Sequence, residues 1–371
     1  MTYYYAQLGN TPNLSFAELN ALLASSPVLL EPTLVKLQTD KSPSLLGDAL
    51  GGTTKLIKPL TPTSVVKLTS DLTTLIHQLS HKNVAITSLV PDLQLSQTQL
   101  HDIKKEVSQT KPIRFLSLKT SGHSLVALRK QHIAEFVILK DNGVLTLGQT
   151  AWIQDADDWA NRDRDKPYRD IKKGMLPPKV ARIMVNLACQ GQSNLSLVDP
   201  FCGTGTILLE AALSQISALF GSDVNNKAVL GAKQNLTWLA NNYNLPPINS
   251  KFELVDATHL DERLSSVDVI VTEPYMGPLL DSHTSQNLEK LKNTVKGLSK
   301  LYTGALKSWH KIISDQGRVV ISIPSFLVQD RQLFTLTVDD YARLGYNYIS
   351  SVAYSKPGAT VIRNITILTK T

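Results

Sequence analysis

The stretch that most constrains this chain lies at residues 198–212, which read V-D-P-F-C-G-T-G-T-I-L-L-E-A-A. An apolar run ends in Asp199, a turn with Gly203 and Gly205 follows, and apolar residues at helical spacing begin at Ile207. A strand, a glycine turn and a helix in this order form a ligand site at the carboxyl end of the first strand of an open α/β sheet. The glycines let the backbone approach a bound molecule closely. We therefore expect an α/β fold with a ligand at the glycine turn, residues 200–205.

The rest of the second half supports a mostly parallel sheet, because strand-like and helix-like segments alternate from Met175 onward. Residues 318–323 look like a strand that Pro324 ends. The last two strand-like segments, 347–354 and 360–368, are joined by a short turn. This spacing predicts an antiparallel hairpin at the end of the sheet.

The first half divides into shorter α/β segments. Ser15 followed by Glu18 has capping-box spacing and predicts a helix that begins at Ser15. Residues 124–128 read as a strand, and Asp141-Asn-Gly predicts a tight hairpin turn. Residues 151–174 are dense in charges of both signs and are interpreted as a connector between domains.

Composition narrows the class of protein. A chain of 371 residues has room for two or three domains, and its net charge of +7 favours a polyanionic partner. No apolar run is long enough to span a membrane, and the N-terminus does not resemble a signal peptide. Cys189 and Cys202 alone can form neither a disulfide framework nor a zinc site, and His77, His81 and His259 lack metal-ligand spacing. We expect a cytoplasmic protein with no metal and no membrane contact.

The position of the acid indicates which ligand the glycine turn binds. A dinucleotide fingerprint places its first glycine directly after the strand, whereas here Asp199 comes first and would repel a pyrophosphate. A carboxylate suits the ammonium and sulfonium groups of S-adenosylmethionine. Asp223 ends the next strand and can accept from ribose hydroxyls, and Asp256 ends a third and can accept from the adenine amino group. These acids disfavour a nicotinamide oxidoreductase and predict S-adenosylmethionine as cofactor.

This block resembles the class I S-adenosylmethionine-dependent methyltransferases. The resemblance implies a Rossmann-like domain whose seven-stranded sheet has the order 3-2-1-4-5-7-6 and an antiparallel C-terminal hairpin. It also implies a set of cofactor-binding residues, with the methionine end held at the glycine turn and the nucleoside at the later acids. That set comprises Asp199, Phe201, Gly203, Gly205, Thr206, Asp223, Asp256 and Ala257, and a resemblance to a narrower family within the class adds Met175 and Pro177.

A second motif concerns the substrate. Residues 267–275 read V-D-V-I-V-T-E-P-Y, a strand that ends in T-E-P-Y. This motif resembles the D/N-P-P-Y/F motif of methyltransferases that act on exocyclic amino groups of bases, with Thr272 and Glu273 in place of the usual acid or amide and the first proline. Acceptors there orient the amino group and receive its proton, and the aromatic ring stacks on the base. We therefore expect Thr272, Glu273, Pro274 and Tyr275 to form the catalytic site, and the substitutions leave open a weak or inactive enzyme.

Further segments resemble a narrower family, the archaeal and eukaryotic THUMP-domain tRNA guanine-10 N2-methyltransferases. The resemblance is strong in 160–280, fair in 1–60 and weak in 62–150, and it is carried by Y-Y-A-Q-L-G-N-T-P-N-L-S-F-A-E-L-N-A-L at 4–22, L-G-G-T-T-K at 50–55, R-D-R-D-K-P-Y-R-D at 162–170 and G-M-L-P-P-K-V-A-R at 174–182. It implies a ferredoxin-like domain (1–61), a THUMP-like RNA-binding domain (62–150), a linker (151–174) and a catalytic domain (175–371). The implied reaction is methylation of the N2 amino group of a guanosine in tRNA, at position 10.

Basic residues in the THUMP-like part favour an RNA surface, although a solvated face explains them equally well. They are Lys104, Lys105, Lys111, Arg114, Lys119, Arg129 and Lys130. Three alternatives stay open: a methyltransferase for guanine N2 in ribosomal RNA, one for adenine N6 in nucleic acid, and an RNA-binding partner protein with a degenerate site. Nothing in the sequence indicates a protein partner, the number of methyl groups added or the oligomeric state.

Overall fold

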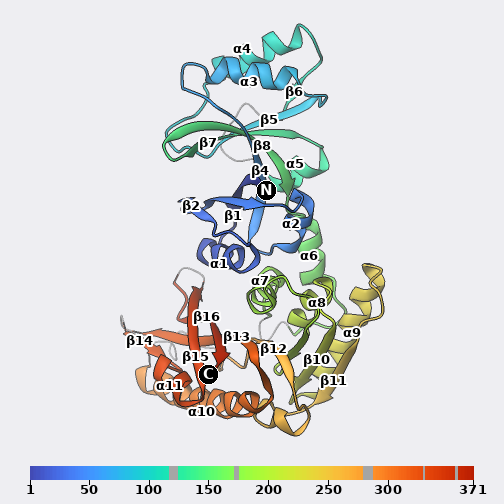
Figure 1. The fold of residues 1–371 in the computed structure, drawn as a ribbon, viewed down its shortest axis with the longest axis vertical. Helices are drawn as coiled ribbons and strands as arrows, with labels where there is room; N and C mark the ends of the chain where they lie inside the picture. The colour runs from blue at the N-terminus through green and yellow to red at the C-terminus, as the bar shows by residue number, and fades with distance from the viewer. Residues whose placement is uncertain (117–123, 171–174, 279–286, 329–330, 356–357) are drawn as a thin grey trace. The chain divides into compact units, whose positions relative to one another are not determined.

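The computed structural model describes residues 1–116, 124–170, 175–278, 287–328, 331–355 and 358–371 (Figure 1). The chain forms two compact units, Met1–Ala160 and Asn161–Thr371. Each unit is built on its own sheet. Among the described residues, no helix combines the length and apolar character that a membrane crossing requires.

The first unit holds a mixed eight-stranded sheet in the order β2-β3-β1-β4-β8-β7-β5-β6. Its strands are β1 (Thr2–Leu8), β2 (Val28–Glu31), β3 (Leu34–Thr39), β4 (Thr53–Pro62), β5 (Asn83–Ser88), β6 (Arg114–Phe115), β7 (Ala134–Asp141) and β8 (Val144–Ile153). Its helices are α1 (Pro12–Leu22), α2 (Pro43–Ala49), α3 (Leu68–His77), α4 (Gln97–Ser108), α5 (Leu125–Lys130) and α6 (Ala156–Arg164), the last of which continues into the second unit. The predicted hairpin turn is confirmed, since Asn142 and Gly143 have φ of 49° and 82° between β7 and β8.

Two expectations for the first half are wrong. Helix α1 begins after Thr11 and not at Ser15, and the Glu18 carboxylate accepts from the backbone N–H groups of Gly51 and Gly52 at 2.8 and 2.9 Å. Buried backbone donors need partners, and Glu18 supplies them across 33 residues. Residues 124–128 belong to helix α5, because a short apolar run does not distinguish a strand from a helix by its period.

The second unit holds the order β11-β10-β9-β12-β13-β16-β15, with β14 paired to β13. Its strands are β9 (Ser196–Asp199), β10 (Ala218–Asp223), β11 (Ser250–Leu254), β12 (Val267–Thr272), β13 (Ile313–Val328), β14 (Arg331–Phe334), β15 (Tyr346–Tyr354) and β16 (Val361–Lys370). Its remaining helices are α7 (Pro178–Cys189), α8 (Thr206–Leu213), α9 (Asn226–Asn242), the 3₁₀ helix η1 (Ala257–Glu262), α10 (Leu288–Ile312) and α11 (Val338–Arg343).

This sheet confirms the Rossmann-like prediction. Strands β9 to β13 run parallel, and β16 and β15 form the antiparallel hairpin. The prediction that Pro324 ends its strand is wrong, because β13 continues to Val328. Pro324 lies between the last residue paired with β12, Ile321, and the first paired with β14, Ser325. A residue without an N–H group fits at such a gap.

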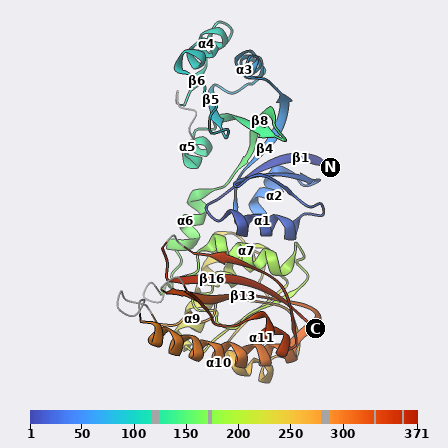
Figure 2. The ribbon, with the colours of Figure 1, turned by 90° about the vertical axis from the view of Figure 1, so that its left-hand side faces the viewer.

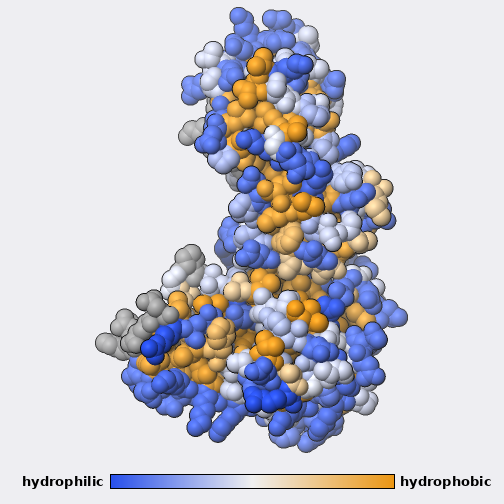
Figure 3. Space-filling view, turned by 60° about the vertical axis from the view of Figure 1, so that its left-hand side comes forward, coloured by the Kyte–Doolittle hydropathy of each residue, from blue (hydrophilic) through white to orange (hydrophobic). Residues whose placement is uncertain are grey.

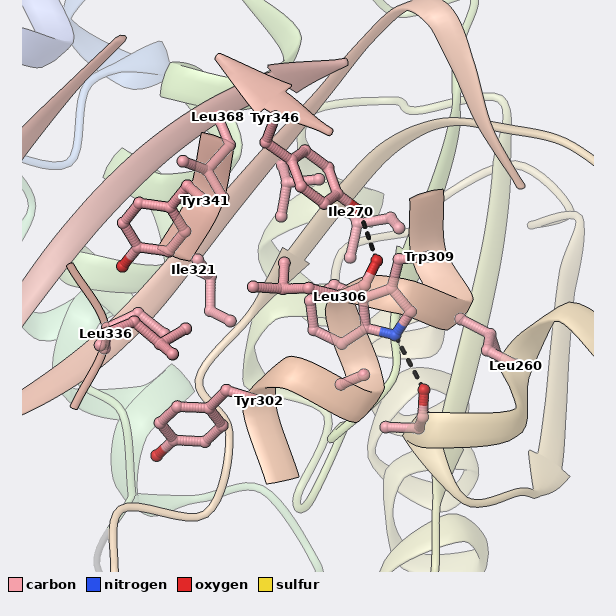
Figure 4. Close-up of a cluster of buried hydrophobic side chains, with 14 of the residues drawn as sticks. Leu260, Ile270, Tyr302, Leu306, Trp309, Ile321, Leu336, Tyr341, Tyr346 and Leu368 are labelled. Atoms are coloured by element: carbon pink, nitrogen blue, oxygen red, sulfur yellow. Dashed lines mark hydrogen bonds between the residues drawn. The ribbon is translucent and has the colours of Figure 1, made fainter. Parts of the chain in front are cut away.

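Helices cover both faces of this sheet, with α10 and α11 on one side and α7 on the other (Figure 2). The core under α10 is rich in aromatic side chains whose polar atoms are hydrogen-bonded (Figure 4). Trp309 Nε1 donates to Ala257 O at 3.0 Å, and Tyr346 OH donates to Leu306 O at 2.8 Å. The first bond fixes α10 against η1 and the second fixes it against β15, and α10 borders the candidate site.

Candidate functional site

The glycine turn connects β9 to α8 and depends on two left-handed glycines. Gly203 and Gly205 have φ of 51° and 79°, and Gly205 is the N-cap of α8. A Cβ on Gly205 would lie 3.0 Å from the Cβ of Ala232 on α9, so this glycine serves helix packing. A Cβ on Gly203 would meet only the Phe201 carbonyl oxygen, at 3.9 Å. The backbone at Gly203 is therefore open to a ligand.

Carboxylates from two neighbouring strands meet at this turn. Asp199 is 2% exposed, and its Oδ1 accepts from Phe201 N at 3.3 Å. Asp223 ends β10, and its Oδ2 and Oδ1 accept from Gly203 N at 3.1 Å and Asn225 N at 2.9 Å. The backbone of the turn thus orients both acids.

The site is electronegative. The pKa of Asp199 is raised to about 7, chiefly by burial; hydrogen bonds from Thr272 and Phe201 oppose the shift, and the charges of Asp223 and Glu273 contribute to it. Within the described ranges, neither Asp199 nor Asp223 forms an ion pair with a basic side chain. Two acids without a cation, next to an open backbone, suit a positively charged ligand.

The third acid lies farther along the same edge of the sheet. Asp256 is exposed and caps η1, where its Oδ1 accepts from Thr258 N at 2.9 Å and Thr258 Oγ1 at 2.8 Å. Ala257 is buried beside it, and the Phe201 ring packs edge-on against Trp309 with centroids 6.3 Å apart. These contacts join η1 to the glycine turn through the core under α10.

The remaining predicted cofactor residues lie in two places. Met175 and Pro177 are half-buried and directly precede α7. Thr206 is the first residue of α8, and its Oγ1 accepts from the buried Lys166 Nζ at 2.8 Å. Roles for all three in cofactor binding stay predictions.

The T-E-P-Y motif (residues 272–275) follows β12 and adjoins the glycine turn. Thr272 is fully buried, and its Oγ1 donates to Asp199 Oδ1 at 2.7 Å. Because this hydroxyl hydrogen is committed to Asp199, Thr272 orients the acid of the glycine turn. The bond joins the predicted cofactor site to the predicted catalytic motif.

The other motif residues are held by partners that sequence reasoning missed. Glu273 Oε1 accepts from Arg363 Nε at 2.6 Å, and Pro274 is buried. Tyr302 OH donates to the backbone oxygen of Tyr275 at 2.6 Å. Tyr275 itself is 56% exposed. The motif therefore presents an exposed ring on a fixed backbone.

A buried charged cluster supports α8 from the segment that the sequence indicated as a connector. Glu210 accepts from Arg162 Nη1 at 2.7 and 2.5 Å and from Arg182 Nε at 3.0 Å. Lys166 is among the largest fully buried side chains. Charges of both signs alternate in 162–170. Nothing else in the sequence distinguished these buried residues from solvated ones.

The basic residues proposed for RNA contact differ in their availability. Lys104, Lys105 and Arg114 are exposed, whereas Arg129 and Lys130 form ion pairs with Asp155 and Asp157. Lys111 Nζ donates to the carbonyl oxygens of Ile76, His77 and Leu79 at the end of α3. Lys119 lies outside the described residues.

Comparison with known proteins agrees with this geometry. The family model described as RMKL-like, methyltransferase domain, matches residues 166–328. A tRNA (guanine(10)-N2)-dimethyltransferase of Methanothermobacter thermautotrophicus is 33% identical over 167 residues, which cover 45% of this chain and 43% of that one. A probable tRNA (guanine(10)-N2)-dimethyltransferase of Methanothermococcus thermolithotrophicus is 31% identical over 127 residues, 33% of this chain and 74% of that one.

A solved structure extends the comparison to the whole chain. The crystal structure of TrmN from Thermus thermophilus superposes with a TM-score of 0.56 and 16% identity, covering 100% of this chain and 99% of that one. This likeness shows a shared fold. The chain spans about half the length of most of the curated relatives that it matches. On the sequence matches, the chain belongs to the tRNA (guanine(10)-N2)-dimethyltransferase family, within the S-adenosylmethionine-dependent methyltransferases of class I.

Proposed function

We propose that the chain transfers methyl groups from S-adenosylmethionine to the N2 amino group of a guanosine in tRNA, at position 10. The observation that carries this proposal is the hydrogen bond between Thr272 Oγ1 and Asp199 Oδ1, 2.7 Å long. It joins a motif that resembles those of amino-group methyltransferases to an acidic glycine turn. The names of the relatives supply the substrate, a guanosine of tRNA.

The residues present fit this cofactor. The open backbone at Gly203 and the buried carboxylate of Asp199 suit a methionine end that carries an ammonium group. Asp223, which faces the same turn, would hold the ribose, and Asp256 the adenine amino group. When bound, S-adenosylmethionine supplies a methyl group activated by a positively charged sulfur.

The chain's own residues would position and deprotonate the target amino group. The exposed Tyr275 ring offers a stacking face for the base, a contact worth about 1–3 kcal/mol. Glu273 engages Arg363 through Oε1, and no donor in the described parts of the chain reaches Oε2. We assign to Oε2 the proton that the N2 group loses, and the neighbouring backbone carbonyls supply further acceptors.

The domain assignment is part of the proposal. We assign 1–61 to a ferredoxin-like domain, 62–150 to a THUMP-like domain, 151–174 to a linker and 175–371 to the catalytic domain. Two separate apolar clusters in the first unit support the first division, one around Leu19 and Leu37 and the other around Ile76 and Ile103. The exposed Lys104, Lys105 and Arg114 support RNA binding by the second domain. The two free, buried cysteines fit a reducing cytoplasm.

The decisive experiment incubates labelled S-adenosylmethionine with unmodified tRNA transcripts and identifies the product nucleoside by mass spectrometry. The proposal expects N2-methylguanosine or its dimethyl form at position 10, and a transcript with adenosine at position 10 is the control. Label recovered as N6-methyladenosine, or transfer to ribosomal RNA but not to tRNA when the two are offered in parallel, would identify one of the alternative enzymes. Tight RNA binding without any transfer would favour the RNA-binding partner protein.

A further inference from the structure

A shallow groove adjoins the T-E-P-Y motif on the side of helix α10. Its volume is about 280 Å³, and it is lined by Tyr275, Gly277, Pro278, Asn293, Thr294, Gly297, Leu298 and Leu301. The motif and the turn after it form one wall, and one face of α10 forms the other. The exposed Tyr275 ring thus borders two spaces, the predicted target site and this groove.

Gly297 keeps the α10 side of the groove free of side-chain atoms at that position. A Cβ added to Gly297 would meet no atom within 4 Å, so nothing in the helix packing requires glycine there. Glycine in a helix interior destabilises the helix relative to alanine. Gly297 weakens α10 and does not serve its packing. Its presence is explained if a larger side chain there would close the groove.

Lysines follow one edge of the groove. Three lysines recur every fourth residue of α10: Lys292, Lys296 and Lys300. Each directly precedes a groove residue, so the three form a stripe along the edge of the groove at Asn293 and Gly297. All three are exposed. Lys292 pairs with Glu289 at 3.0 Å, whereas Lys296 and Lys300 form no ion pair within the described ranges. Figure 3 shows hydrophilic residues along the lower rim of the second unit, where Figure 1 places α10.

We propose that this groove and the lysine stripe of α10 bind the RNA nucleotide adjacent to the target guanosine. The stripe contacts its phosphates, and its base enters the groove beside Tyr275. Apolar walls with a positively charged edge match an unstacked nucleotide, whose base is flat and whose backbone is anionic. The inference rests on the proposed function, because it takes Tyr275 as the stacking residue.

The lysine stripe is tested by the double variant K296Q/K300Q. The matched control is K227Q/K233Q, which removes two exposed charges from α9, a helix that packs over β10 and β11. We expect the α10 pair to weaken binding of an unmodified tRNA transcript about tenfold and to lower the slope of log K against log salt by about 1.4. The α9 pair should leave both quantities unchanged.

The groove is tested by filling it. Gly297→Leu should lower kcat/KM for tRNA about tenfold or more, whereas Gly297→Ala should retain it and unfold at a higher temperature. Calorimetry should give the same Kd for S-adenosylmethionine in all four variants. This separates the groove from the cofactor site.

The outcomes distinguish this inference from the proposed function. Equal losses for the α9 and α10 pairs, or wild-type methylation by both K296Q/K300Q and Gly297→Leu, would overturn the inference and leave the function standing. Variant-dependent RNA binding by a protein that transfers no methyl group would overturn the function, and with it the target guanosine, while supporting nucleotide binding by the groove and the stripe. Binding of poly-glutamate serves as a second probe. If the α10 substitutions weakened binding of poly-glutamate but not of RNA, the ligand would be an acidic protein and the inference would be overturned.

Discussion

Arg363 Nε on β16 donates to Glu273 Oε1 over 2.6 Å, so a strand 90 residues farther along the chain holds the T-E-P-Y motif. Both side chains are largely buried, with 30% and 15% exposure. This pair fixes one carboxylate oxygen of Glu273, and no donor in the described parts of the chain reaches the other.

The first prediction concerns this pair. Arg363→Met should lower kcat for methyl transfer about tenfold, or about 1.4 kcal/mol in activation free energy, since Glu273 loses the cation that orients it. The Kd for S-adenosylmethionine should not change. Arg363→Lys keeps the charge and should recover part of the rate in the same steady-state assay. A variant with wild-type kcat and weaker cofactor binding would contradict the assignment.

The second prediction is a pH dependence of cofactor binding. Burial raises the pKa of Asp199 to about 7, and a bound cation favours its ionised form. Affinity for S-adenosylmethionine should therefore fall about tenfold per pH unit below 7, with uptake of the cofactor releasing close to one proton at pH 6. Calorimetry in two buffers of different ionisation enthalpy measures this release.

The raised pKa of Asp199 also affects the stability of the folded protein. A carboxyl whose folded pKa is raised favours the folded state at low pH, and this contribution disappears as pH rises from about 4 to about 7. Asp199→Asn should remove both this stability loss and the proton release. Proton release that persists in the asparagine variant would assign the titration to another group.

The third prediction concerns Lys166. Burial lowers its pKa to about 8, while the charges of Asp163 and Glu210 oppose the shift. The protonated amine therefore destabilises the folded state fully below pH 8, and the penalty fades as pH rises from about 8 to about 10.5. Lys166→Met should be more stable than wild type at pH 7 by up to about 3 kcal/mol, with a smaller difference at pH 10. Urea unfolding at both pH values checks this; lower stability of the variant at both would refute it.

The fourth prediction concerns the ion pairs under α8. Glu210→Gln removes the carboxylate charge that the buried Arg162 and Arg182 both contact, and it should cost about 3–5 kcal/mol in unfolding free energy. Glu253→Gln breaks the more exposed pair with Lys251 and should cost less than about 1 kcal/mol. Urea denaturation of the two variants gives the comparison. Equal costs would mean that the Glu210 cluster is solvated.

Local sequence signals predicted the parts of the site that depend on neighbouring residues. The order of acid and glycines at 199–205 located the turn, and the strand before T-E-P-Y located the motif at a strand tip. Parallel strands bring such tips together, which is why two segments 73 residues apart could be placed at one edge.

Side chains that act from distant segments could not be predicted in this way. Arg363 and Tyr302 lie within ordinary strand and helix patterns, and nothing near them indicates a contact with residues 273–275. Glu18 illustrates the same limit, since its spacing from Ser15 suggested a local cap, whereas its carboxylate accepts from the backbone N–H groups of the turn at Gly51 and Gly52. Tertiary contacts decided these cases against local propensity.

The pairing of β4 with β8 has a consequence for how this architecture can change over evolution. The chain leaves β4 at Pro62 and returns in β8 at Val144, and Pro62 lies opposite Thr146 in the register. Residues 63–143 therefore begin and end at neighbouring points, as an inserted module does. Such a module can be gained, lost or exchanged by a lineage while the strands on either side remain joined, so residues 63–143 can diverge independently of the rest of the first unit.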